Sequence, residues 1–385
     1  MLELAVKGNK WYWGWMVVLL GVVSAGFGLY LMQLKFGLGI TGMSRDVSWG
    51  FYIANFTYLV GVAAGGVMVV LPYYLHDYKA YGKITILGEF LAIAAIVMCL
   101  VFILVDLGQP MRALNVLIYP TPNSVLFYDA IVLNGYLLLN LVIGWNVLQA
   151  ERNGVHYQSW LKPLIYISIP WAVSIHTVTA YLYCGLPGRH FWLTAILAPR
   201  FLASAFAAGP ALLILLCLFI RRFTNFDPGR QQIQALATTV AYAICINVFF
   251  LLCEVFVAFY SQIPGHMDHL KYLFVGLHGH GALVPWMWAS MIFMAVGIVL
   301  TVIPATRRNE ATLAVACVVI ILGTWIDKGL GMISGGFVPN PMHVVNEYAP
   351  SIPEIGITLG VYALGAMVLT VLYKMAVGVK EEVHG

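Results

Sequence analysis

Charge is the first thing that this sequence has little of. Only 9% of its 385 residues are Asp, Glu, Lys or Arg, whereas 61% are hydrophobic. Soluble domains carry about a quarter charged residues, so the composition excludes an ordinary soluble protein and favours one that lipid surrounds. The formal net charge of +4 is too small to indicate a nucleic-acid partner.

The sequence also lacks paired cysteine motifs and the features of a signal peptide. The six cysteines stand singly in apolar stretches and no C-x-x-C occurs, so the spacing offers neither an iron–sulfur cluster nor a zinc site. Residues 1–10 are polar, and no small-residue cleavage site follows the first apolar run. A signal peptide is therefore not expected, and we expect that run to be the first membrane anchor.

Long apolar runs are what the chain has in abundance. A spanning helix needs about 20 mostly apolar residues. Ten stretches qualify: 14–34, 49–72, 84–106, 126–148, 163–184, 200–220, 234–260, 282–303, 311–333 and 354–374. The predicted fold class is an all-α integral membrane protein with ten transmembrane helices, forming a single membrane domain over 1–385.

A weak internal sequence repeat suggests how these helices are grouped. Residues 63–66 read AAGG, and residues 207–210, 144 positions later, read AAGP. An offset of four helices preserves direction, so the chain would form two parallel four-helix bundles plus two outer helices. The repeats would be 49–184 and 200–333, with outer helices at 14–34 and 354–374. Small-residue runs also occur wherever helices pack closely, so the repeat is a hypothesis.

Lysine and arginine predict the orientation. The termini and even-numbered loops hold 13 of them, and the odd-numbered loops, in which we count Arg200, hold 7. This bias predicts a multi-pass protein of the cytoplasmic (inner) membrane with both termini in the cytoplasm. The outer loops are longer and rich in aromatics, Gly, Pro and His, as in docking or site-forming surfaces or ordered caps. The sequence leaves open whether HGHG at 278–281 contacts a partner, a metal or water.

Ionisable and amide side chains within the spans gather in the outer half of the membrane, given a rise of about 1.5 Å per residue. This outer group comprises Asn55, Asp106, Asp129, His176, Glu254, Asp327 and Lys328. Only Glu89 lies near the inner face. Charged groups in hydrocarbon are costly, so the group indicates a functional site. In the structural alternative, Asp327 and Lys328 pair with each other while Asp106 and Asp129 reach the surface.

His176 lies well inside its span and permits three interpretations. Haem b would need a second histidine at matching depth, and the other nine lie in loops, helix ends or the tail, so haem is not expected. The residue can be a core histidine bonded to a carbonyl, or it can bind a quinone carbonyl and accept a proton. A quinone site would have His176 and Asp106 as catalytic residues, Asn55, Asp129, Tyr181 and Glu254 as quinone-binding residues, Glu89, Asp327 and Lys328 as a proton path, and no metal. Tyr183, on the same predicted helix as His176 and Tyr181, is a further candidate for this site.

Two other function classes compete with a quinone site. In a proton-coupled secondary transporter or proton channel, Glu89, His176, Glu254 and Asp327 would form a relay through helices that prolines break near the midplane. Pro170 and Pro210 are suitably placed. A purely structural anchor for redox partners would leave His176 unexplained.

The chain resembles the NrfD/PsrC family (polysulfide reductase membrane subunit) in four stretches: SWGFYIANFTYLVGVAAGG, FILVDLGQPMR, SIHTVTAYLYCGLPGRHFW and TAILAPRFLASAFAAGPALL. Their order and spacing are most similar to the ten-helix DsrP branch of sulfite-reduction-associated DsrMKJOP-type complexes, with the Hmc-type subunit second. Gln109 stands in DLGQP where the family usually has arginine, a departure that would weaken a contact with an anionic group.

The resemblance implies a subunit with no haem and no iron–sulfur cluster of its own, which binds exchangeable menaquinone or ubiquinone near the periplasmic face. A ferredoxin-like periplasmic iron–sulfur subunit would dock there and exchange electrons with the quinone. A DsrP-type complex would add a multihaem cytochrome c, a haem b membrane subunit and a cytoplasmic iron–sulfur subunit, and would serve sulfur metabolism. Such a menaquinol oxidoreductase subunit is expected to be inactive alone. By the same resemblance, Asp106 and His176 would belong to the quinone and proton site.

Overall fold

A computed structural model describes residues 1–76 and 78–384. Ten helices in this part of the chain are long and apolar enough to cross a membrane, which confirms the predicted all-α membrane fold. The elements of the first half are α1 (Leu2–Val6), α2 (Lys10–Phe36), η1 (Leu38–Ile40), α3 (Phe51–Gly65), α4 (Val67–Leu75), η2 (Lys79–Lys83), α5 (Thr85–Asp106), η3 (Pro110–Arg112), α6 (Asn115–Ile118), α7 (Val125–Arg152) and α8 (Leu161–Cys184). Those of the second half are η4 (His190–Trp192), α9 (Leu197–Phe223), α10 (Arg230–Tyr260), α11 (Pro264–Phe274), α12 (Val284–Val302), α13 (Pro304–Arg308), α14 (Glu310–Trp325), η5 (Ile326–Ser334), η6 (Gly335–Phe337) and α15 (Ile352–His384).

Helix ends are set by capping groups that lie beyond the apolar runs. The side chain of Asn9 accepts a hydrogen bond from the backbone N–H of Tyr12 at 2.9 Å, so α2 begins at Lys10 rather than at residue 14. At the start of α15, Ser351 and Glu354 form a capping box, in which the Glu354 carboxylate accepts the Ser351 N–H at 2.8 Å. Capped polar ends therefore lengthen both outer helices.

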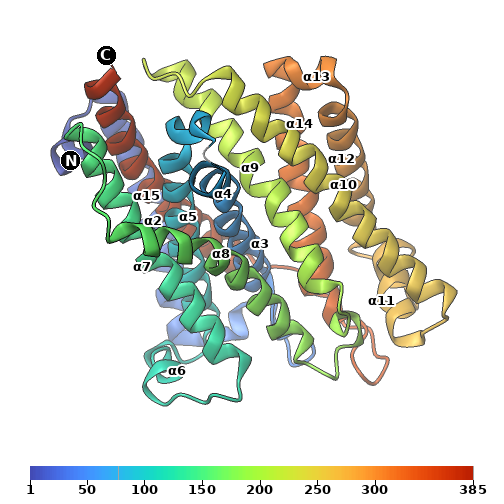
Figure 1. Ribbon diagram of the computed structural model, residues 1–385. Coiled ribbons are helices and arrows are strands. Elements are labelled where there is room, and N and C mark those ends of the chain that lie inside the picture. The colour runs from blue at the N-terminus through green and yellow to red at the C-terminus, as the bar shows by residue number, and fades with distance from the viewer. Residues whose placement is uncertain (77, 385) are drawn as a thin grey trace.

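The two ends of the molecule differ in character (Figure 1). Both termini lie at one end, here called the termini end. Helices α6 and α11 lie at the opposite end with most of the longer connections, and this loop end is built from residues 37–50, 107–124, 185–196, 261–283 and 335–351. The spanning helices run between the two ends in alternating directions.

The helices pack in two groups with the same pattern of neighbours. In the first group α3 packs on α5, α5 on α7, α7 on α8 and α8 on α3; in the second, α9 packs on α10, α10 on α12, α12 on α14 and α14 on α9. The outer helices α2 and α15 pack on each other, and α15 also contacts α5 and α7. This pattern supports the repeats expected at 49–184 and 200–333, which we retain as a proposal.

The two groups meet where α3 crosses α9. A Cβ atom built on Gly65 would lie 2.7 Å from the Cα of Gly209, its counterpart 144 positions later, so the backbones touch there. Glycine at both positions permits this approach, as small residues do at helix crossings in membranes. The span that contains α3 is 94% buried, whereas α2 is only 11% buried. The core of the molecule therefore lies around α3, and α2 is exposed along most of its surface.

Candidate functional site

His176 lies where the two helix groups meet. It is completely buried on α8, two turns before the end of that helix at the loop end. Its Nε2 accepts a hydrogen bond from the amino group of Lys328, and its ring lies 5.1 Å from the ring of Phe201. The other ring nitrogen, Nδ1, is buried and has no hydrogen-bond partner among the described residues. In the neutral imidazole, Nδ1 would therefore carry the hydrogen and be free to donate it.

Lys328 reaches His176 from a π-helical segment, η5, that continues α14. Such segments are uncommon and concentrate at functional sites. Besides His176, the buried amino group contacts the hydroxyl of Ser204 at 3.1 Å and the backbone oxygen of Phe201 at 3.3 Å. A Cβ atom built on Gly61 of α3 would lie 3.1 Å from this nitrogen, so the glycine leaves room for the histidine–lysine pair.

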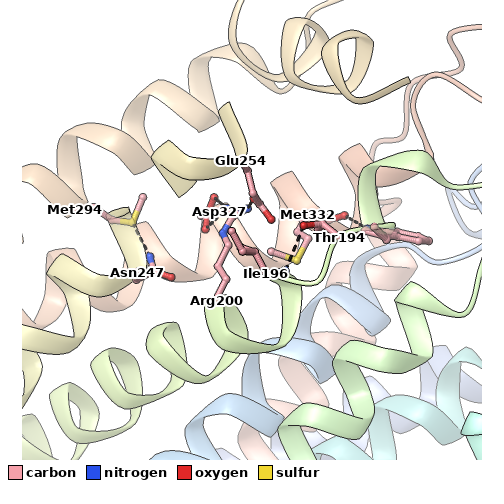
Figure 2. A network of polar contacts seen from close by, with 9 residues as sticks. Thr194, Ile196, Arg200, Asn247, Glu254, Met294, Asp327 and Met332 are labelled. Atoms are coloured by element: carbon pink, nitrogen blue, oxygen red, sulfur yellow. Dashed lines mark hydrogen bonds and ion pairs between the residues drawn. The ribbon is translucent and has the colours of Figure 1, made fainter. Parts of the chain in front are cut away.

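Arg200 forms a second buried network beside this pair (Figure 2). One guanidinium nitrogen donates to both carboxylate oxygens of Asp327 at 2.7 and 2.9 Å, and another donates to Glu254. The arginine and Asp327 side chains are 4% and 2% exposed, and that of Glu254 is 11% exposed. Removing one member of such a buried network costs roughly 3–5 kcal/mol, because it leaves an uncompensated charge.

These contacts correct two expectations. Arg200, expected in an outer loop, lies in the first turn of α9 and is buried. Asp327 and Lys328 do not pair with each other; the aspartate accepts from Arg200 and the lysine donates to His176. Neighbouring residues on a helix point in different directions, so adjacency in sequence does not by itself decide which side chains pair.

A second polar group lies between α3, α7 and α8. Asp129 is 2% exposed, and its carboxylate accepts a hydrogen bond from the hydroxyl of Thr179 at 2.7 Å. The alternative in which Asp129 reaches the surface is therefore wrong. Nearby on α8, the hydroxyl of Tyr183 shares a hydrogen bond with that of Thr57 on α3. The Tyr183 ring also lies 6.0 Å from the ring of Phe201, which stacks on His176 and so links the two groups.

Asp106 is the last residue of α5 and also lies at the loop end. Its Oδ1 is buried without a hydrogen-bond partner in the described part of the chain. Around this helix end, Gln33 of α2 donates to the backbone oxygen of Val105 at 2.6 Å and accepts from the hydroxyl of Tyr52 at 2.8 Å. The end of α5 is thus held by two helices, α2 and α3.

The other predicted site residues lie apart from these groups. The carbonyl oxygen of Asn55 accepts from Trp325 at 3.0 Å and from Tyr362 at 2.8 Å, so it joins three helices. Tyr181 is 53% exposed on α8 and does not face the buried groups. Glu89 is buried near the start of α5, in the half of the molecule at the termini end, and its Oε2 has no partner among the residues described.

Sequence reasoning named Tyr183 beside Tyr181 but missed Arg200, Ser204 and Thr179 as members of the buried groups. For Thr179, as for Tyr183, the helical repeat was a usable signal. Thr179 and Tyr183 follow His176 by three and seven residues, which places all three on one face of a helix, whereas Tyr181 falls on another face. Arg200 gave no such signal, because it stands at the edge of an apolar run.

The HGHG stretch at the loop end is a tight turn. His278 and Gly279 both have positive φ, 50° and 84°, between Leu277 and His280, whose backbones bond to each other. This is the geometry of a two-residue hairpin turn. Glu347 fixes the turn by accepting the backbone N–H of Ala282 at 2.8 Å. Partial burial opposes ionisation of Glu347, but that N–H and the side chains of His280 and Tyr272 hold its pKa below the usual value. No group of three metal-binding side chains occurs anywhere in residues 1–76 and 78–384.

Comparisons with known proteins identify relatives of this chain. The chain is 26% identical to a dimethyl sulfoxide reductase membrane subunit of Halobacterium salinarum, over 92% of this chain and 89% of that protein. It is 23% identical to the Hdr-like menaquinol oxidoreductase integral membrane subunit of Archaeoglobus fulgidus, over 96% and 92%. It is 20% identical to the menaquinone reductase integral membrane subunit of Nitratidesulfovibrio vulgaris, over 91% and 88%. The family model described as "Polysulphide reductase, NrfD" matches residues 39–338, well over half of the chain, and the protein therefore belongs to the NrfD family.

Proposed function

We propose that this chain is the quinone-reactive membrane subunit of a menaquinol oxidoreductase complex. The observation that carries the proposal is that two buried polar atoms without partners, Nδ1 of His176 and Oδ1 of Asp106, lie in the first helix group, in the half nearer the loop end. Buried polar atoms are almost always satisfied, so two orphans in the same half of one helix group favour a ligand that supplies the missing partners. The names of two relatives, a menaquinol oxidoreductase subunit and a menaquinone reductase subunit, point to the same ligand class.

The residues present fit the head group of a quinol. When oxidised, a bound quinol would supply two electrons to a partner subunit and two protons to the site. His176 would donate through Nδ1 to a ring oxygen, while Lys328 holds its other nitrogen and so fixes the tautomer. Asp106 would accept one of the two protons at Oδ1, and the carboxylate of Asp129 would accept the other. Asp129 with Thr179, and the rings of Tyr183 and Phe201, would form the wall between these two residues.

Proton movement is a further part of the proposal. Lys328 contacts His176 directly: as an ammonium it can give a proton to Nε2, and as a neutral amine it can take one up. Asp327 holds Arg200, which does not titrate, so it would act on the path only through its charge. In the half of the molecule at the termini end, Oε2 of Glu89 is another buried polar atom without a hydrogen-bond partner among the described residues. A cavity of about 400 Å³ lies at the same end, lined by Gly82, Lys83, Glu151, Asn225, Phe226, Asp227, Lys380 and Glu381. We propose Glu89 as a proton-binding group on a path from that end.

The remaining assignments also stand as proposals. The loop end would face the periplasm and receive a ferredoxin-like iron–sulfur subunit, and both termini would lie in the cytoplasm. The complex would be of the DsrP type, with a multihaem cytochrome c, a haem b membrane subunit and a cytoplasmic iron–sulfur subunit, and would act in sulfur metabolism. Relatives described as membrane or integral membrane subunits support the general idea of partner subunits.

Quinol oxidation by the purified complex tests the proposal. His176→Gln keeps an acceptor for Lys328 but removes the imidazole, and Asp106→Asn removes the carboxylate. Each is expected to lower turnover by roughly 10²–10⁴-fold, the usual contribution of a general acid or base. His156→Gln, at an exposed histidine in the α7–α8 loop, is the matched control and should leave the rate unchanged. Full turnover in both site variants, with the complex intact, would overturn the proposal.

A further inference from the structure

Lys328 has two possible buried partners, and only one of them is used. Asp327, the preceding residue, is close enough for the two charges to attract. The amino group nevertheless contacts His176, Ser204 and Phe201, and it bonds to no carboxylate in the described part of the chain. From these contacts we infer that Arg200 is a positioning residue: by occupying Asp327, it leaves Lys328 to His176.

Arg200 engages both carboxylate oxygens of Asp327. Both oxygens accept from one guanidinium nitrogen of the arginine, at 2.7 and 2.9 Å. The same arginine holds Glu254 with another nitrogen. The planar guanidinium offers five donors in a fixed fork, so a single arginine can hold two carboxylates at once. A lysine at position 200 would have one small ammonium and could not span both.

Lys328 would prefer the carboxylate of Asp327 if that carboxylate were free. Hydrogen bonds between two charged groups are roughly twice as strong as neutral ones, and charges attract more strongly in a buried, low-dielectric site. The bond from Lys328 to the imidazole of His176 has only one charged member. Without Arg200, two buried carboxylates would face one lysine, and the lysine would turn towards Asp327.

The tautomer of His176 depends in turn on its hydrogen bond with Lys328. That this tautomer matters for catalysis rests on the proposed function. With Lys328 turned away, neither ring nitrogen of His176 would have a partner among the described residues. The imidazole would no longer be held in the tautomer that leaves Nδ1–H for a ligand. Arg200 touches neither the ligand nor His176, and it would act only through Asp327 and Lys328.

Ring-nitrogen NMR of the complex, labelled with ¹⁵N-histidine, tests the inference without any turnover. The His176 signals are assigned by their loss in His176→Gln. In Arg200→Gln, the Nε2 signal is expected to shift from that of a hydrogen-bonded acceptor to that of a free imidazole nitrogen. In Arg200→Gln combined with Asp327→Asn it should return to the wild-type position, because no free carboxylate then attracts Lys328. Arg221→Gln, which removes an ion pair with Glu310 at the other end of α9, should leave the signal unchanged.

The rate of quinol oxidation provides the second readout. If the Arg200→Gln complex does not assemble, Arg200→Lys is used in its place. Quinol oxidation should fall by about 10²-fold in either variant, in line with the loss of a positioned acid or base. An unchanged His176 signal in the Arg200 variant, or a shift that Asp327→Asn does not reverse, would overturn the inference. A wild-type complex that does not oxidise quinol would instead refute the proposed function, and the NMR result would stand by itself.

Discussion

The crossing of α3 and α9 provides a stability prediction with a clear geometric basis. In Gly65→Ala the new methyl group would lie 2.7 Å from the Cα of Gly209 and 2.9 Å from the backbone oxygen of Ala205. Both neighbours are backbone atoms and cannot rotate away. Overpacking of this kind costs about 1–3 kcal/mol, against a gain of roughly 0.5–1 kcal/mol when alanine replaces glycine in a helix. We expect a net loss of about 1–2 kcal/mol.

The matched control lies on α2, where Gly28 has no atom within 4 Å of its missing side chain. Gly28→Ala should leave stability unchanged or raise it by up to about 1 kcal/mol, because only helix propensity changes. The assay is the temperature at which half of the detergent-solubilised protein loses its monodisperse chromatographic peak. A Gly65→Ala midpoint equal to or above that of Gly28→Ala would show that the backbones do not touch as described.

Three further predictions concern stability at other positions. Glu354→Gln leaves an amide where a carboxylate accepted three donors, so we expect a loss of at least about 2 kcal/mol in the same thermal assay. Burial lowers the pKa of His269 to about 4 from 6.5. Between pH 4 and pH 6.5 the unfolded chain therefore binds more protons than the folded chain. Stability at the loop end should fall by on the order of 3 kcal/mol as pH drops from 6.5 to 4, measured by proteolysis, and His269→Gln should abolish that dependence. Asn55→Leu orphans the Trp325 and Tyr362 donors and should cost about 1–3 kcal/mol. Asn146→Leu, at a partly exposed asparagine that bonds to the backbone of its own helix, should be nearly neutral.

The ten spanning helices were predictable because a helix that crosses the bilayer needs a long run of apolar residues, which can be recognised in the sequence. The ends of these helices were harder to predict. The caps at Asn9 and Ser351 lie outside the apolar runs, and η5 continues α14 through Asp327, Lys328 and two glycines without a break that hydropathy would reveal.

The candidate site was predictable as a region but not as a set of pairs. The outer-half group was visible because ionisable residues are rare in the spans. Which side chains pair depends on helix rotation and on contacts between helices far apart in the chain. Arg200 joins helices 54 and 127 positions away in sequence. Nothing local to Asp327 indicates that its partner is that arginine rather than the adjacent lysine.

Photoaffinity labelling would show where the quinone binds. The intact complex would be irradiated with a photoreactive azidoquinone, and the modified peptides would be identified by mass spectrometry, with excess menaquinone as competitor. The account predicts competed labelling of loop-end segments of α3, α5, α7 or α8, near Asp106, Asp129 and His176. Labelling confined to the termini end, at the cavity beside Lys83 and Glu151, would contradict it.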